Sequence, residues 1–177
     1  MPTAFRQVFV LCLCACLLQS LAGQFNHLIT SFAITLDFAG LLIAFAALRL
    51  PFRPALIVAL FTGLWVDAYD PVSFGRHAFL YGLAVCLIHQ LRDRLPREET
   101  FVCVVTALFT NLALCVLAGF LDLGALPDAG DGALRLLADL VASQLATALI
   151  GPWFIALQLR SLQLARAEPV SALRRYA

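Results

Sequence analysis

The sequence is poor in charge and has no lysine, and these two absences exclude several classes of protein. Charged residues make up 13% of the 177 residues, and all twelve basic residues are arginines. A chain without lysine cannot form a lysine Schiff base or bind phosphate through the lysine of a P-loop. The formal net charge of +1 argues against a broad surface that binds nucleic acid.

The sequence is rich in apolar residues, and their proportion indicates the class of the protein. Hydrophobic residues account for 62% of the chain, and the mean hydropathy is +0.92. Soluble domains are about 45–50% apolar and about 25% charged. The composition therefore excludes a soluble enzyme and a disordered chain, and predicts a single integral membrane domain over residues 1–177.

The six cysteines carry no recognisable metal or redox motif. No C-x-x-C pair occurs, and three of the six alternate within one apolar run. Residues two apart on a helix point to nearly opposite sides, so these three cannot converge on one metal ion. We predict that the cysteines act as small apolar residues in buried positions, at Cys12, Cys14, Cys16, Cys86, Cys103 and Cys115.

Six apolar stretches are candidates for membrane-spanning helices, each of which needs about 17–25 mostly apolar residues. They cover residues 7–23, 28–48, 54–69, 77–91, 101–121, and a last stretch that starts near residue 133 and passes Gly151 and Pro152. The third and fourth are short for a span, and the Gly-Pro pair is expected to bend the last helix. The sequence thus predicts an all-α polytopic membrane protein, a bundle of about six transmembrane helices.

The distribution of arginine predicts how these helices are oriented. Only Arg76 and Arg135 lie on one side of the predicted membrane, together with Asp70, Asp122, Asp128 and Asp131. Cytoplasmic loops carry the excess of positive charge in membrane proteins, so we expect both termini in the cytoplasm and the acidic segment 122–132 outside. The ten arginines on the cytoplasmic side are Arg6, Arg49, Arg53, Arg92, Arg94, Arg97, Arg160, Arg166, Arg174 and Arg175.

The first stretch also fits a second interpretation. Arg6, the apolar residues 8–18 and the small residues Ser20 and Ala22 have the pattern of a cleavable signal peptide. From the sequence, both retention of this stretch as a span and its cleavage stay open. Cleavage would leave the topology of the other five stretches unchanged.

Three acidic residues, Asp37, Asp67 and Asp139, fall inside the predicted spans and favour the outer half of the membrane. A carboxylate at the centre of the bilayer costs about 2.5–3.5 kcal/mol on insertion scales, so each of them requires an explanation. One interpretation is a polar cluster that seats a cation, a substrate or a basic group of a partner. The other is that each carboxylate is protonated, hydrogen-bonded between helices, or placed as a helix cap.

No catalytic or metal-binding motif accompanies these acids. The sequence contains no Ser-His-Asp arrangement, no H-E-x-x-H motif and no glycine-rich phosphate loop. The histidines His27, His77 and His89 fall near helix ends rather than in one cluster. We therefore predict a protein that is not an enzyme and that uses no metal ion or cofactor.

Small residues recur every four positions in three of the stretches. Such a face lets two helices approach closely, and we expect most of these contacts to lie within the chain. The residues concerned are Gly40 and Ala44, then Ala78, Gly82 and Cys86, and finally Ala142 and Ala146.

The segment between the third and fourth stretches carries a recognisable motif. Gly63 precedes Asp67 by four residues, and Gly75 follows Asp67 by eight, before an apolar helix and a basic loop. Asp67 and Asp70 lie about one helical turn apart and share a face. This pattern resembles the MreD family of bacterial rod-shape-determining membrane proteins.

Other positions agree with this resemblance, which covers nearly the whole chain. Asp37 lies where the family often has a Pro-Asp pair, although Leu36 replaces the proline. Pro152 and Trp153, followed by an apolar stretch and Arg160, resemble the end of the family's sequences. Chain length and the number of spans also agree.

The resemblance implies a non-catalytic subunit of the cell-elongation complex, which builds peptidoglycan and sets cell shape at the bacterial inner membrane. The implied partners are an MreC-like protein, actin-like MreB filaments, a cell-wall glycosyltransferase, a transpeptidase and membrane lipids. Because the family's fold is similar to that of substrate-binding components of vitamin transporters, the alternative is a small-molecule-binding transporter component whose site uses the outer aspartates. Candidate contact residues are Gly63, Asp67, Asp70, Gly75, Asp37, Asp139, Pro152 and Trp153.

Overall fold

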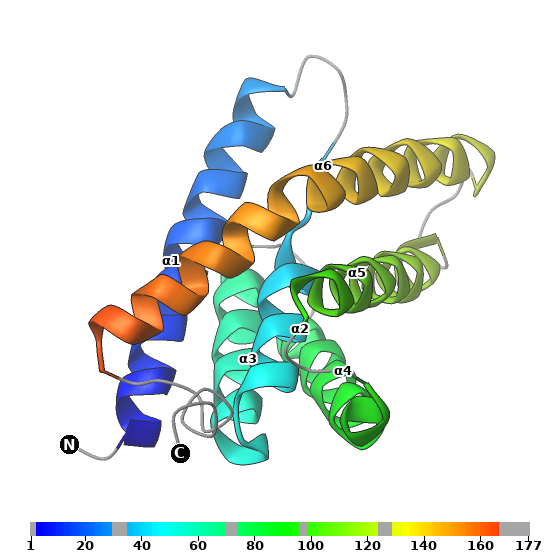
Figure 1. The fold of residues 1–177 in the computed structure, drawn as a ribbon. Helices are drawn as coiled ribbons and strands as arrows, with labels where there is room; N and C mark the ends of the chain where they lie inside the picture. The colour runs from blue at the N-terminus through cyan, green and yellow to red at the C-terminus, as the bar shows by residue number, and fades with distance from the viewer. Residues whose placement is uncertain (1–2, 30–34, 70–73, 96–98, 124–128, 167–177) are drawn as a thin grey trace.

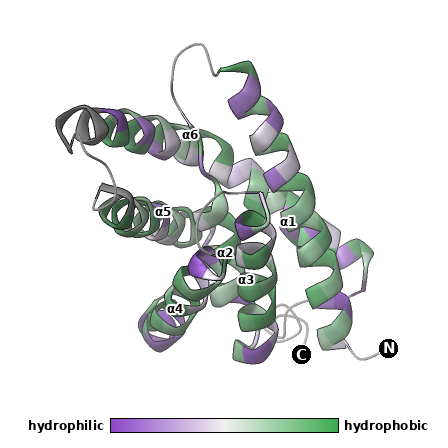
Figure 2. Cartoon of the chain, turned by 180° about the vertical axis from the view of Figure 1, so that it is seen from behind, coloured by the Kyte–Doolittle hydropathy of each residue, from purple (hydrophilic) through white to green (hydrophobic). Residues whose placement is uncertain are grey.

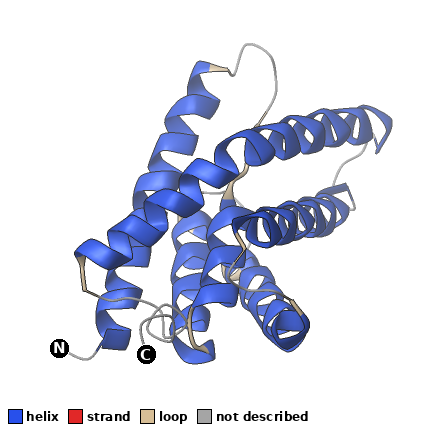
Figure 3. Ribbon diagram, in the orientation of Figure 1, coloured by secondary structure: helices blue, strands red, loops and turns tan. Residues whose placement is uncertain are grey.

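The computed structural model describes residues 3–29, 35–69, 74–95, 99–123 and 129–166, and within these ranges it contains helices joined by loops and turns and no strand (Figures 1 and 3). The predicted all-α class is confirmed, and each α-helix falls on one of the six predicted stretches. The helices are α1 (Thr3–Leu28), α2 (Ala39–Arg49), α3 (Phe52–Asp67), α4 (Arg76–Leu91), α5 (Thr100–Leu123) and α6 (Ala129–Leu164), with a short 3-10 helix η2 (Arg92–Arg94) after α4.

Three of these helices are long and apolar enough to cross a membrane. The qualifying segments are Thr3–Leu28 in α1, Thr100–Leu121 in α5 and Arg135–Leu164 in α6. Helices α3 and α4 have 16 residues each, which is slightly below the usual length of a span. These lengths and compositions support a membrane protein.

The second predicted span is wrong as a single helix. We predicted one helical stretch over residues 28–48, but residues 35–38 are not helical and α2 begins at Ala39. The 11 residues of α2 rise about 16 Å, roughly half of the hydrocarbon core of a bilayer. Residues 35–38 are not helical, and we refer to them as the extended segment.

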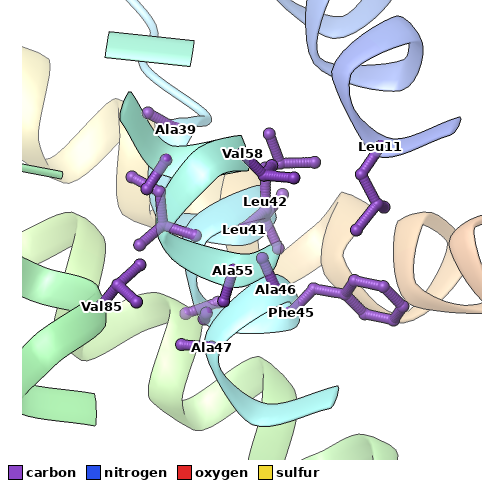
Figure 4. Packing of buried hydrophobic residues seen from close by; sticks show 14 of the residues in the cluster. Leu11, Ala39, Leu41, Leu42, Phe45, Ala46, Ala47, Ala55, Val58 and Val85 are labelled. Carbon is purple, nitrogen blue, oxygen red and sulfur yellow. The ribbon is translucent and has the colours of Figure 1, made fainter. Parts of the chain in front are cut away.

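Helix α2 forms the centre of the molecule. All of its residues from Ala39 to Leu48 are buried, and α2 packs against each of the other five helices. Figure 4 shows Leu41, Leu42 and Phe45 of α2 among side chains from neighbouring helices. A helix that is apolar on every side belongs in a core, and burial by the other helices accounts for the composition of α2.

The outer faces of the surrounding helices are apolar. On α1, Phe5, Phe9, Leu13, Leu17 and Leu21 recur every four residues, and all of them are exposed. In Figure 2, the colour of hydrophobic residues extends along most of the length of the helices. Soluble proteins rarely expose apolar patches of this extent, whereas in a bilayer these faces contact lipid.

Gly40 and Gly63 permit close contacts between helices. Close contacts were predicted at Gly40 and at Ala78, and Ala78 is the residue that Gly63 meets. A Cβ on Gly63 of α3 would overlap the backbone of Ala78 in α4, and a Cβ on Gly40 of α2 would lie 2.7 Å from the Asn111 backbone in α5. Among the cysteines, Cys103 is buried as predicted, whereas the other five are partly exposed.

Helix α6 runs without a break through Pro152. Figure 1 shows that this long helix changes direction part-way along its length. The neighbouring Gly151 is buried, and a Cβ there would lie 3.4 Å from the Leu41 and Val104 side chains. The bend predicted from the Gly-Pro pair is thus accommodated within one continuous helix.

Candidate functional site

The carboxylate of Asp67, at the last residue of α3, caps the beginning of α4. Its Oδ2 accepts hydrogen bonds from the backbone N–H groups of Gly75 (3.0 Å) and Ala78 (3.3 Å), and its Oδ1 accepts one from the N–H of His77 (3.0 Å). The first N–H groups of a helix have no partner within that helix, and negative charge is favourable at this end of the dipole. Asp67 therefore supplies from α3 the cap that α4 lacks in its own N-cap residue.

The His77 side chain completes the surroundings of Asp67. His77 Nδ1 lies 2.8 Å from Asp67 Oδ1, and the imidazole ring contacts Tyr81 edge-on at a centroid distance of 5.9 Å. Asp67 is only 5% exposed. Both of its oxygens are thus engaged by groups of this chain.

The two glycines of the motif belong to the same structural unit. Gly63 lies one turn before Asp67, so both face α4, and Gly63 contacts the backbone of Ala78. Gly75 is the N-cap of α4 and has φ +96°, a left-handed conformation that favours glycine. Gly63, Asp67 and Gly75 therefore form one unit, which we call the α3–α4 joint.

Asp139 of α6 binds the extended segment. Its Oδ1 accepts a hydrogen bond from the Thr35 backbone N–H (2.8 Å), and its Oδ2 accepts one from the Thr35 hydroxyl (2.9 Å). On the opposite side, Asn26 of α1 pairs with Leu36, accepting from its N–H (2.8 Å) and donating to its carbonyl (3.0 Å). Side chains from α1 and α6 thus hold the segment between them.

Ser143 and Asp37 complete this arrangement. The Ser143 hydroxyl donates to the Thr35 carbonyl (3.4 Å) and accepts from the Asp37 N–H (3.1 Å). The Asp37 carboxylate accepts from the N–H of Ala39, the first residue of α2 (2.9 Å). Non-helical backbone at membrane depth requires such partners because hydrocarbon supplies none. All three acids that were predicted to lie within the spans therefore accept hydrogen bonds from backbone groups.

A cavity of about 190 Å³ lies between the extended segment and the start of α4. Asp37, Asp139, Ser143, His77 and Tyr81 are among the residues that line it. The structure thus brings Asp37 and Asp139 to one cavity, together with the histidine that contacts Asp67. Its volume is below the roughly 300–1,000 Å³ of typical ligand pockets.

The other predicted site residues lie elsewhere or are not described. Asp70 falls outside the described residues. Pro152 and Trp153 are exposed on α6, with Trp153 81% exposed. They follow Asp139 by 13 and 14 residues, which is about 20 Å along the helix, so the structure does not bring them to the acids. Within the described ranges, no three His, Cys, Asp or Glu side chains are placed to hold a metal ion.

The sequence analysis missed several residues that take part in these contacts. It used Arg76 and Arg92 only to assign topology, but Arg92 donates to the carbonyl of Leu50 after α2, and Arg76 donates to that of Ala118 in α5. Cations are favourable near helix C-termini, where carbonyls lack partners. It also passed over Thr35, Asn26 and Ser143, whose only signal was their polarity next to apolar stretches.

The chain has no match among protein-family models, curated proteins or solved structures. The interpretation of the site therefore depends on its own geometry and on the motif resemblance.

Proposed function

We propose that this chain is a non-catalytic membrane subunit of the bacterial cell-elongation complex and acts through helix and loop contacts with partner proteins. The observation that carries the proposal is the α3–α4 joint. The residues of the MreD-like motif, Gly63, Asp67 and Gly75, span 13 positions and meet at one place, each with a distinct physical task. Their convergence supports the resemblance on which the proposal rests.

The use of the charged groups supports a structural role for this subunit. Asp67 and Asp139 accept hydrogen bonds from backbone N–H groups, and Arg92 donates to a backbone carbonyl. These side chains hold short helices and an extended segment in place. The proposed partners are an MreC-like protein, MreB filaments, a glycosyltransferase and a transpeptidase.

Because Asp67 is buried, we propose that partner contacts involve the exposed residues around the joint. Phe74 immediately precedes Gly75 and is 74% exposed. A large, exposed apolar side chain next to the joint is suited to pack against another membrane protein. We therefore assign the partner contact of the joint to the surface that includes Phe74.

The test is made in a rod-shaped bacterium that depends on this gene. We expect depletion of the protein to produce rounded cells. We also expect Phe74→Ala to reduce co-purification of the MreC-like partner without lowering membrane abundance. Phe109→Ala, which removes an equally exposed phenylalanine from α5, is the matched control. Cells that stay rod-shaped after depletion would contradict the proposal, and equal effects of the two variants would contradict the assignment to Phe74.

The alternative function is a small-molecule-binding component of a membrane transporter. The cavity lined by Asp37 and Asp139 favours it, although its volume of about 190 Å³ is small for a vitamin. A thermal-shift screen of the purified protein against vitamins and metal ions tests this function. A ligand at 100 times its Kd should stabilise the protein by about 2.7 kcal/mol. Stabilisation that is lost in Asp37→Asn would favour the transporter component over the elongation subunit.

A further inference from the structure

A second, larger cavity lies between α1 and α3, and we call it the α1–α3 cavity. Its volume is about 510 Å³, which falls within the roughly 300–1,000 Å³ of ligand pockets. Gln19, Gln24 and Asn26 of α1 line one side, and Trp65 and Tyr69 at the end of α3 line the other. The cavity thus lies toward the end of α3 that carries Asp67.

Uncharged polar groups dominate the α1 side of this cavity. None of the described residues that line it carries a charge. Gln19 Nε2 is buried and has no hydrogen-bond partner among the described residues. A buried donor without an acceptor is costly, so rotation of the Gln19 amide toward an acceptor on a molecule bound in the cavity would be favourable. The Asn26 side chain forms two hydrogen bonds with the Leu36 backbone, which fix its position in the wall of the cavity.

Aromatic rings form the α3 side. Trp65 lies between Phe61, with a centroid distance of 6.1 Å, and Tyr69, with a centroid distance of 5.7 Å. The Trp65 and Tyr69 rings are in contact and tilted by 57°, so a flat aromatic ligand cannot be sandwiched between them. Trp and Tyr are also the residues enriched where a membrane meets water. The cavity therefore offers one aromatic wall at the level of lipid headgroups.

We propose that the α1–α3 cavity binds the uncharged, hydroxyl-bearing ring of a sugar, either free or as the headgroup of a glycolipid. Sugar hydroxyls both donate and accept hydrogen bonds, as the amides of Gln19 and Gln24 do. The C–H face of the ring is apolar and packs on an aromatic side chain such as Trp65. Recognition of phosphate or carboxylate generally uses arginine or a similar donor set, which the described lining lacks. This site is independent of the proposed partner contacts.

Trp65 provides a direct readout of binding, because the chain has only one other tryptophan, the exposed Trp153. The experiment uses the full chain with Trp153→Phe in phosphatidylcholine nanodiscs. One arm adds maltose, a second adds glucosyl-diacylglycerol to the bilayer, and a third adds plain diacylglycerol at the same mole fraction. We expect a saturable change in Trp65 fluorescence with a sugar-bearing probe and none with diacylglycerol. A response to maltose identifies a free sugar as ligand, and a response to the glycolipid alone identifies a headgroup.

Variants in the cavity test the assignment further. We expect Gln19→Leu to weaken binding at least about fivefold, the effect of losing one hydrogen bond, and Gln24→Leu to weaken it to a smaller extent because Gln24 is exposed. Gln163→Leu, on an exposed face of α6, should bind as the parent chain does. If Gln19→Leu fails to fold, the effect of Gln24→Leu on binding of the sugar-bearing probe tests the proposal. The absence of a response to both sugar probes, an equal response to charged phosphatidylglycerol, or unchanged binding in the folded cavity variants would overturn the proposal.

Discussion

Asp67 illustrates how one carboxylate can be accommodated in a membrane protein. It accepts three backbone N–H bonds from the start of α4 and contacts His77. Hydrogen bonds to a charged acceptor are roughly twice as strong as neutral ones, and the helix dipole adds to the attraction. The cost of burying the charge is thereby offset, and the residue holds α3 and α4 together.

We expect Asp67→Ala to lower the free energy of unfolding by about 2–3 kcal/mol, because three amides lose their acceptor in a buried place. SDS titration in mixed micelles measures this quantity. His77→Ala is the matched comparison, since it keeps all three backbone bonds to Asp67, and we expect it to cost about 1 kcal/mol. Unchanged stability of Asp67→Ala would show that the cap does not hold α4.

Gly63 and Gly23 both lie within helices and form a matched pair for a second prediction about single residues. Gly63 contacts the α4 backbone, whereas a Cβ on Gly23 in α1 would meet no atom within 4 Å. We expect Gly63→Ala to destabilise the protein by about 1–3 kcal/mol through overpacking. Gly23→Ala should be neutral or stabilising by up to about 1 kcal/mol, because alanine favours helix. SDS titration measures the stability of both variants. Equal effects of Gly63→Ala and Gly23→Ala would mean that α3 and α4 are not in close contact.

At the level of elements, the extended segment is the most unusual feature. It connects to the buried helix α2 and is held by Asn26 from one side and by Asp139 and Ser143 from the other. None of these bonds lies within a regular helix. The position of α2 in the core therefore depends on polar side chains of α1 and α6.

We expect Asp139→Ala to release this segment while the long helices stay folded. Hydrogen exchange at the amides of Thr35, Leu36 and Asp37 should accelerate at least about tenfold, because an opening of this kind loses about 1.4 kcal/mol or more of hydrogen bonding. Amides of α5 should exchange as before. Arg135→Ala, at an exposed position one turn from Asp139, is the control. Unaltered exchange in Asp139→Ala would mean that Asp139 does not hold the segment.

For the whole molecule, the arginine distribution predicts an orientation that the fold makes testable. Arg94 follows α4 at one end of the α3–α4 pair, and Phe74 precedes α4 at the other end. In a chain whose six native cysteines are replaced, Phe74→Cys should react with an impermeant thiol reagent in intact cells, whereas Arg94→Cys should react only after the cells are opened. The reverse pattern would contradict a cytoplasmic location of both termini.

The sequence by itself determined the helical class of the protein and the approximate location of its helices, apart from the start of α2. Hydropathy is a property of each stretch, so 62% apolar residues and six apolar runs were sufficient to predict six helical segments. The spacing of Gly63, Asp67 and Gly75 was also visible, and so was the small-residue face that includes Gly40. Turns and helix faces depend on residues a few positions apart, which a single sequence displays directly.

Only the tertiary structure decided what the polar residues do. The break before α2 requires Asp139, which lies 104 positions from Thr35, and a local apolar pattern contains no information about so distant a partner. The α1–α3 cavity likewise combines Gln19 with Trp65, two residues on helices separated by the extended segment and α2. Polar groups in an apolar environment take whichever partners the packing provides, so their roles follow from the fold rather than from their own stretch of sequence.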